Sequence, residues 1–225
     1  MPLVNSSPFL PKLIILVGVL VPVLVSTVAR AEWTGISVNI EDYSTTWQFQ
    51  TLQRTIDINQ WNFNLEEKTT SALRVGLSIG QSRIRISDNI SPANTQKFHA
   101  NLLGIYLRLP LSLGDNFSVQ GRLSYRINSG RDSKDIDPGQ IEWYETEVEL
   151  GLSGQWQSVR FTPFVAYRNV DGDITDSSGI ELFDPVDEIS TGIRFDYYID
   201  PTAYIRFQLF SGANAGGYLV FAREY

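Results

Sequence analysis

Residue types that commonly carry out catalysis are scarce in this sequence of 225 residues. There is one histidine, His99, and no cysteine, which excludes thiol nucleophiles, cysteine-ligated metal sites and disulfide frameworks. A serine nucleophile needs a base within hydrogen-bond reach and an acid that orients this base. Ser129 is placed to fall near His99, but the sequence offers no convincing third member. We therefore expect no catalytic site and keep His99 and Ser129 only as weak candidates.

Acidic residues gather in the segment 171–176, Asp-Gly-Asp-Ile-Thr-Asp. Asp171, Asp173 and Asp176 resemble part of a calcium-binding loop. The segment lacks the glycine at the sixth position and a correctly spaced bidentate glutamate. Solvated loop charge is thus the favoured interpretation, and a divalent-cation site is the weaker one. We expect no metal, and the absence of a phosphate-binding glycine loop or nucleotide-binding motif predicts no cofactor.

The first thirty-one residues have the pattern of an export signal. They contain no acidic residue, and Lys12 precedes an apolar run over 13–25. An alanine–arginine–alanine triplet ends at Ala31, so the segment 1–31 predicts a cleaved secretory signal peptide. A membrane anchor is the alternative, but the run is shorter than the roughly 20 residues of a spanning helix. Cleavage would leave 32–225 as one domain and change the net charge from −7 to −9, because two basic residues leave with the signal.

Alternation of apolar and polar residues dominates the rest of the sequence. In the clearest example, 117–128, the odd positions are apolar or glycine and the even positions are polar or charged. The segments 145–152, 159–168 and 188–198 alternate in the same way. A period of two marks strands whose two faces meet different environments, and no convincing 3.6-residue period is present. The chain is therefore predicted to be all-β.

The alternation predicts ten strands with two kinds of link. The predicted strands cover residues 33–42, 56–66, 71–86, 97–110, 117–128, 142–154, 159–169, 187–199, 203–211 and 216–225. Short links at 67–70, 111–116, 154–158 and 200–202 alternate with longer polar links at 43–55, 87–96, 129–141, 170–186 and, shorter, 212–215. This alternation is typical of a closed antiparallel up-and-down transmembrane β-barrel. Eight strands is the alternative, if the weakly patterned region 43–66 contains less strand.

Two predicted strands change phase along their length. Ile56 and Ile58 lie on the face opposite to the later apolar residues of their strand, and Ile84 and Ile86 are likewise out of phase with the earlier ones. The two changes would lie opposite each other in one hairpin. We interpret them as a β-bulge, or as the point where the hairpin leaves the membrane and no longer needs a lipid-facing side.

A soluble β-barrel or sandwich would also alternate, so the membrane assignment needs further support. Aromatic residues near the predicted strand ends are typical of interfacial girdles. These aromatic residues are Trp33, Phe117, Tyr125, Trp143, Tyr144, Trp156, Tyr167 and Tyr197. Because lipid would contact the apolar face, the charged face is predicted to line the lumen of the barrel.

The predicted lumen set alternates in charge from strand to strand. It consists of Arg74, Arg108, Arg122, Arg126, Glu145, Glu147, Glu149, Arg160, Arg168, Arg194, Asp196 and Arg206. Opposite charges on neighbouring strands stabilise a sheet when they lie across from each other. The short turns predict two such contacts, Asp196 with Arg206 and Glu145 with Arg168.

A leader, about ten amphipathic strands, alternating link lengths and a terminal aromatic residue together resemble a small Gram-negative outer-membrane β-barrel protein. In that class the last strand ends on an aromatic residue preceded by alternate hydrophobic residues, which the barrel-assembly machinery reads. Leu219, Phe221 and Tyr225 match this signal, whereas Arg223 departs from it. The resemblance implies a location in the cell outer membrane and contact with its lipids and lipopolysaccharide. It is architectural, and no motif points to a particular member.

The sequence favours a structural or surface-interaction role over enzymatic activity. Small barrels are filled by their own side chains, so we expect a lumen closed by the charged set. A narrow porin-like channel for small solutes is the first alternative, and a membrane-embedded hydrolase is the second. We expect a monomer, and the net charge of −7 argues against a nucleic-acid partner.

Overall fold

The computed structural model describes residues 34–50, 52–69, 73–88, 95–132, 139–177 and 179–225. The predicted signal peptide and Trp33 lie outside these residues. The described chain has no helix that is long and apolar enough to cross a membrane. It forms the strands β1 (Gly35–Phe49), β2 (Leu52–Lys68), β3 (Arg74–Asp88), β4 (Gln96–Ser112), β5 (Phe117–Asp132), β6 (Gln140–Trp156), β7 (Val159–Asp176), β8 (Gly179–Pro185), β9 (Ile189–Tyr198), β10 (Ala203–Gly212) and β11 (Asn214–Glu224).

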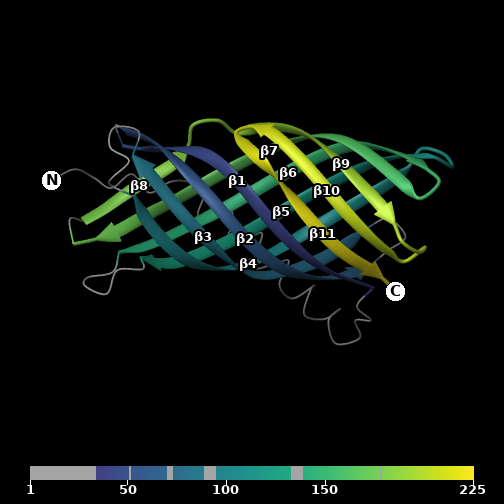
Figure 1. The fold of residues 1–225 in the computed structure, drawn as a ribbon, viewed down its shortest axis with the longest axis horizontal. Helices are drawn as coiled ribbons and strands as arrows, with labels where there is room; N and C mark the ends of the chain where they lie inside the picture. Colours follow the sequence, from purple (N-terminus) through teal and green to yellow (C-terminus); the bar gives the residue numbers. More distant parts are fainter. Residues whose placement is uncertain (1–33, 51, 70–72, 89–94, 133–138, 178) are drawn as a thin grey trace. The chain divides into compact units, whose positions relative to one another are not determined.

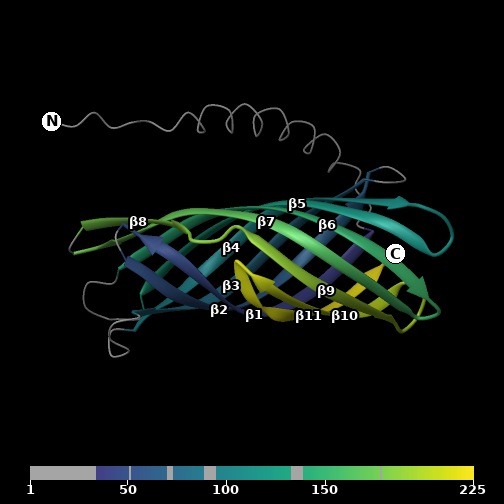
Figure 2. The same ribbon diagram turned by 90° about the horizontal axis from the view of Figure 1, so that it is seen from above.

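Ten of these strands form a closed antiparallel barrel (Figures 1 and 2). Each strand from β1 to β6 pairs with the next one, β7 pairs with β9, β9 with β10, β10 with β11, and β11 returns to β1. The predicted all-β barrel of ten strands is therefore confirmed. The alternative of an eight-strand ring is wrong. Closure leaves no unpaired edge, which matters in hydrocarbon because an unpaired backbone group there costs several kcal/mol.

The pairing register fixes the stagger of the barrel. From Ile40, the paired residues on β2 to β6 lead to Asp173 on β7. In the other direction, the paired residues on β11, β10 and β9 lead to Phe161, twelve residues earlier on the same strand. A stagger of this size requires strands that are tilted roughly 35–45° from the barrel axis. In Figure 1 the strands run obliquely to the long axis of the barrel.

The strand β8 lies outside the ten-strand ring. It pairs with the end of β7 and, through Trp47–Phe49, with the end of β1, beyond the ends of β9, β10 and β11 (Figure 1). We call this end of the barrel the loop end and the opposite end, with the short links and Tyr225, the turn end. At the loop end β1 to β7 and β8 together surround the lumen. The ring thus narrows from ten strands to eight.

The predicted long links 43–55 and 170–186 are wrong. β1 and β2 continue to Phe49 and Leu52, and most of 170–186 belongs to β7 and β8. The link 129–141 is also shorter than predicted, because β5 and β6 extend into it at both ends. The error has a physical cause: these strand extensions are apolar on the inner face and polar on the outer face. Nearer the turn end the pattern is the reverse, with an apolar outer face and a polar inner face.

The interpretation of the phase change as a β-bulge is also wrong. β2 and β3 pair one to one without interruption from Arg54 opposite Asp88 to Lys68 opposite Arg74. The inner face of β2 instead changes composition, from Asn62 and neighbouring polar residues to Ile58 and Ile56 at the loop end. The other interpretation explains this pattern, because a hairpin that extends beyond the membrane no longer needs an apolar outer face.

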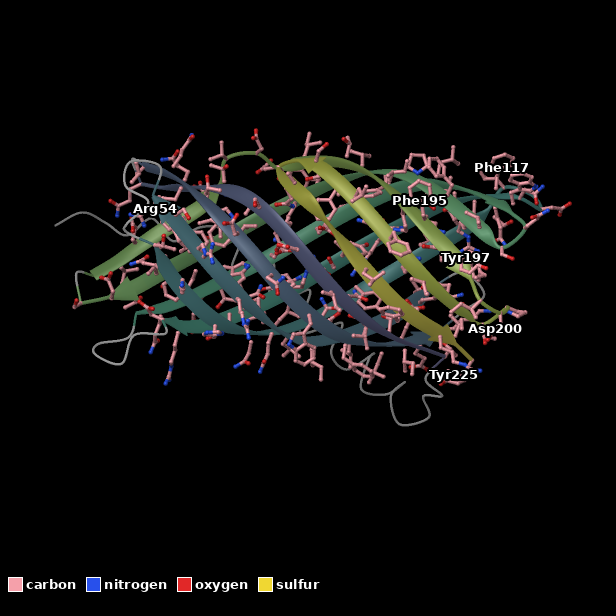
Figure 3. All side chains as sticks on the ribbon, viewed as in Figure 1. Arg54, Phe117, Phe195, Tyr197, Asp200 and Tyr225 are labelled. Atoms are coloured by element: carbon pink, nitrogen blue, oxygen red, sulfur yellow. The ribbon has the colours of Figure 1, made fainter. Side chains whose placement is uncertain are left out.

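The outer wall is apolar over the part of the barrel that all ten strands share. Its exposed side chains include Val38, Ile40, Leu77, Ile79, Leu103, Ile105, Leu123, Ile127, Val148, Leu150, Val165, Phe195, Phe207, Leu209 and Phe221. Figure 3 places Phe117, Tyr197 and Tyr225 near the turn end, and Arg54 near the loop end. Of the predicted girdle aromatics, Trp143 does not face outward: it is 1% exposed and lies inside the barrel.

Candidate functional site

The lumen near the turn end contains ion pairs within the β2–β3 hairpin and between strands that are far apart in sequence. Arg74 and Arg108 approach Glu66 Oε1 at 3.0 and 2.6 Å. The same two arginines lie 2.9 and 3.3 Å from Glu224 Oε1. Four charges from β2, β3, β4 and β11 thus form one network. Glu66 and Glu224 were absent from the predicted set, although the phase of Asn62, Asn64 and Glu66 on β2 would have indicated an inward position for Glu66.

A second network lies further into the barrel and centres on Glu145. This carboxylate is 2% exposed and contacts Arg126 at 2.8 Å and Arg168. Arg168 also donates a hydrogen bond to the Tyr43 hydroxyl at 2.8 Å, across the lumen from β7 to β1. The contact between Glu145 and Arg168 confirms the prediction made from the short turn.

The strands β9 and β10 add two close pairs. Arg206 donates Nε and Nη2 to the two oxygens of Asp196 at 2.6 and 2.9 Å, which confirms the second predicted contact. Arg194 Nη2 donates to both oxygens of Glu149 at 2.6 and 2.7 Å, and its Nε donates to Gln208 at 2.8 Å. These pairs satisfy charges that the surrounding wall would otherwise desolvate at a high cost.

The remaining members of the predicted lumen set have weaker contacts. Glu147 lies 3.7 Å from Arg126. Arg160 donates to Gln155 at 2.9 Å and lies over the Tyr198 ring. The guanidinium of Arg122 lies over the Tyr106 ring at 5.0 Å and opposite Glu149 in the sheet register. We refer to this predicted set, with Glu41, Glu66 and Glu224, as the charged layer.

The lumen at the loop end has the opposite character. Trp47 stacks on Phe183 with ring centroids 4.3 Å apart and lies 5.8 Å from the Trp143 ring. The cluster around them contains Tyr43, Trp47, Phe49, Ile56, Ile58, Ile84, Ile86, Phe98, Ala100, Ile141, Trp143, Val170, Ile174 and Phe183, each at most 5% exposed. We call this set the apolar cluster. The cluster was not predicted from the sequence, although the phase change at Ile56 and Ile84 indicates it.

A salt bridge beside the apolar cluster joins the two strands that flank β1. Arg54 on β2 contacts Glu181 on β8 at 3.1 Å, and its guanidinium lies 4.6 Å from the centre of the Phe49 ring. Both charged side chains are partly exposed, so this pair contributes less than a buried one.

Two small cavities remain inside the charged layer. One, of about 60 Å³, lies among Tyr106, Arg108, Arg122 and Arg206. The other, of about 40 Å³, lies between the first one and the apolar cluster, beside Tyr43. Cavities of this size have room for a few water molecules.

Ser129 falls near His99, as the sequence predicts, because the register places it diagonally across on the same face of the neighbouring strand; no hydrogen bond joins the two side chains among the described residues. His99 faces outward, as its phase predicts, and lies opposite Arg83 and Arg131 on the neighbouring strands. Ser129 lies opposite Asn101, and its hydroxyl donates to Glu142 Oε1 at 3.2 Å.

The acidic segment 171–176 forms part of β7 instead of a loop, so the loop interpretation is wrong. Strand alternation places Asp171 and Asp173 on the outer wall, where the Thr175 hydroxyl donates to Asp173 at 3.2 Å. Asp176 ends the strand. Among the described residues, no group of three or more His, Cys, Asp or Glu side chains is arranged to hold a metal ion.

The predicted assembly signal lies on the last strand. Phe221 and Tyr225 are exposed on the outer wall, at 48% and 72%. Leu219 is on the same face of β11, opposite Ile40 of β1 and Phe207 of β10.

A closed antiparallel barrel with an apolar outer wall and a charged interior is the architecture of outer-membrane β-barrels, and the described chain has this fold. No family model matches the sequence, and a search of curated proteins finds no match.

Three solved structures illustrate the likeness of fold. The translocator domain of the autotransporter NalP from Neisseria meningitidis has a TM-score of 0.49 at 10% identity, over 92% of this chain and 93% of that one. The outer-membrane protease OmpT from Escherichia coli has a TM-score of 0.48 at 9% identity, over 86% and 94%. An outer-membrane channel from Pseudomonas putida F1 has a TM-score of 0.46 at 10% identity, over 86% and 96%. Likeness at these identities concerns the fold and assigns no activity.

Proposed function

We propose that the chain is an integral outer-membrane β-barrel whose lumen is closed by its own side chains and whose role is structural or surface-interactive. The observation that carries this proposal is the apolar cluster at the loop end. Trp47, Phe49 and Ile141 are 0% exposed there, and they span the lumen where the ring narrows to eight strands. A hydrated ion entering this layer would lose its water without gaining a polar partner.

The charged layer supports the same proposal from the other end of the lumen. Its arginines and carboxylates contact each other between neighbouring strands, as in the pair of Arg206 with Asp196, and over an intervening strand, as in the pair of Arg194 on β9 with Glu149 on β6. Side chains that are held by several partners resist displacement by a passing solute. The two cavities of about 60 and 40 Å³ are too small to serve as a wide aqueous passage.

A narrow channel for small solutes is the second candidate. The favouring observation is the charged layer itself, because facing arginine and glutamate columns produce a transverse field like that of a selective pore. For conduction the apolar cluster would have to open. The two candidates therefore differ in one measurable property, the conductance of the reconstituted barrel.

Single-channel recording in a planar bilayer tests the proposal. We expect the exported protein to give no steady unitary steps, because the apolar cluster closes the lumen. A double variant Trp47→Ala/Trp143→Ala removes two large rings from this layer and is expected to give measurable steps. The matched control Trp61→Ala alters a ring that is 49% exposed on the outer wall and should remain silent.

Two results of these recordings would overturn the proposal. Steady, sizeable steps from the unmodified protein would favour the channel. Heat-dependent gel migration of each variant, measured in parallel, reports whether the barrel has formed. A folded but silent double variant would show that the apolar cluster is not the barrier.

The proposed function is not enzymatic. This part of the proposal is supported by the hydrogen bond that Ser129 donates to Glu142 instead of to His99. Lipid-hydrolase activity that disappears in both His99→Ala and Ser129→Ala would contradict this. We further propose a monomer that is exported through the predicted signal peptide and inserted by the barrel-assembly machinery.

A further inference from the structure

Three basic side chains lie directly opposite each other on the outer wall of β3, β4 and β5. Arg83 pairs with His99 in the sheet register, and His99 pairs with Arg131. All three residues are exposed, and no ion-pair partner is found for them in the part of the chain that the structure describes. Like charges close together on one face of a sheet repel each other, and here the arginines of β3 and β5 flank the imidazole of His99. An anion bound between the two arginines would remove this repulsion.

The polarity of the outer wall changes in steps toward this row. Leu103 and Ile127 lie opposite each other in the apolar wall. The next outward-facing pair is Asn101 with Ser129, and the pair after that is His99 with Arg131. Successive outward residues are about 7 Å apart along a strand. Apolar, neutral polar and cationic side chains thus follow in the order of hydrocarbon, ester and phosphate in a membrane leaflet.

The surroundings limit the cationic site to one part of the wall. Arg85, the next outward residue on β3, lies opposite Asp57 on β2 and Lys97 on β4, so a carboxylate stands beside this second pair of basic residues. Arg83 and His99 line an open groove on the outer wall, and Asp42 and Asn59 line its β1–β2 side. At the β6–β7 side, the residues opposite each other are Glu142 and Asp173. Arg83 and Arg131, on either side of His99, therefore carry the positive charge of this row.

We propose that Arg83, His99 and Arg131 bind the phosphate groups of a multiply phosphorylated lipid of the surrounding membrane leaflet. This inference rests on the membrane placement in the proposed function. Neighbouring strands lie about 4.8 Å apart, so the backbones of β3 and β5 are separated by about 10 Å. This spacing allows each arginine to contact a different phosphate while the imidazole between them donates a further hydrogen bond. A lipid with two phosphates fits the row better than a lipid with one.

Binding of diphosphorylated lipid A by the barrel in phosphatidylcholine nanodiscs tests the proposal. We expect saturable binding by the unmodified protein and about 30-fold weaker binding by Arg83→Gln/Arg131→Gln, since each arginine near an anionic lipid surface contributes about fivefold. Arg223→Gln is the matched control, because Arg223 is on the outer wall near the turn end, beside Tyr225. Monophosphorylated lipid A should bind the unmodified protein more weakly.

Each outcome supports or overturns the proposal. Equal binding by the double variant and the unmodified protein would overturn it, as would equal loss in Arg223→Gln. Inorganic phosphate is the second probe, and competition by it at the affinity of the lipid would assign the site to a free anion. Heat-dependent gel migration of each variant verifies the fold. A protein that fails to enter nanodiscs would overturn the membrane placement as well, whereas insertion with binding independent of these arginines overturns only the lipid site.

Discussion

Buried charges in this barrel share their partners. Glu145 contacts Arg126 and Arg168, and Arg168 also contacts Tyr43 on the far side of the lumen. Removing one member of such a group leaves the others desolvated and without a counter-charge. The penalty for an unpaired buried charge exceeds the net gain from forming the pair. Single residues in the charged layer are therefore expected to have large effects on stability.

The variant Glu145→Gln tests this expectation. It should lower the free energy of unfolding by about 3 kcal/mol or more, because two arginines lose their carboxylate. The matched control is Glu142→Gln on the outer face of the same strand, where the change should stay within about 0.5 kcal/mol. Urea unfolding of the barrel in lipid vesicles, followed by tryptophan fluorescence, measures both. Equal losses in the two variants would contradict a shared buried network.

The link between β9 and β10 contains a residue whose titration is tied to its turn. The Thr202 hydroxyl donates to Asp200 at 2.8 Å, and the backbone N–H groups of Thr202 and Ala203 donate at 2.7 and 2.8 Å. The hydroxyl, together with these backbone donors, lowers the pKa of Asp200 below its ordinary value. A carboxylate with a lowered pKa in the folded state stabilises the turn above its ordinary pKa, and this contribution is lost as the pH falls through the lowered value.

Replacement of Thr202 by valine removes the hydroxyl but keeps the backbone donors. We expect the pKa of Asp200 to rise toward its ordinary value in this variant. Carbon-detected NMR titration of the Asp200 carboxyl in micelles measures the change. Thr175→Val, which alters an exposed threonine at the loop end, is the control and should leave Asp200 unaffected. An unchanged pKa in Thr202→Val would assign the shift to the backbone alone.

At the scale of the element, the hairpin of β2 and β3 combines two environments without a break in pairing. Near the turn end the hairpin has an apolar outer face and polar residues inside. Near the loop end its inner residues are Ile56, Ile58, Ile84 and Ile86. Sequence alternation locates the faces of each half correctly, because side chains alternate regardless of surroundings. The phase change alone does not distinguish a bulge from a change of environment. The uninterrupted register decides for the second.

Ile58→Ala tests whether the inner face of this hairpin near the loop end is part of a packed core. Ile58 is 0% exposed within the apolar cluster, so its truncation should cost about 2–5 kcal/mol of unfolding free energy. Ile40→Ala makes the same chemical change at a side chain that is 48% exposed on the outer wall. A smaller loss is expected there, because lipid chains refill the space and no cavity remains. Equal losses in vesicle unfolding measurements would contradict a packed cluster.

At the scale of the whole molecule, closure gives the barrel its kinetic stability. Every strand of the ten-strand ring is paired on both sides, so unfolding cannot begin by fraying of a free edge. We expect the detergent-extracted protein to migrate differently on a gel before and after boiling, because the unboiled barrel stays compact. The boiled sample is the internal control. Identical migration of the two samples would contradict a stable closed barrel.

The sequence by itself determined the all-β class, the ten strands of the ring, the inward position of the charged residues and two cross-strand contacts. These features follow from local rules: alternation assigns faces, and a short turn fixes the register of the strands it joins. Asp196 and Arg206 are ten residues apart, so their contact lies within the reach of such reasoning.

Only the tertiary structure decided how the lumen is filled. Arg168 and Tyr43 meet across 125 residues, and Phe183 stacks on Trp47 because β8 enters between β7 and β1 at the loop end. Local alternation cannot reveal such contacts, because they depend on the stagger with which the sheet closes. The narrowing from ten strands to eight brings apolar inner faces together, and their packing excludes water. The same alternation therefore marks an apolar outer wall near the turn end and an apolar inner face near the loop end.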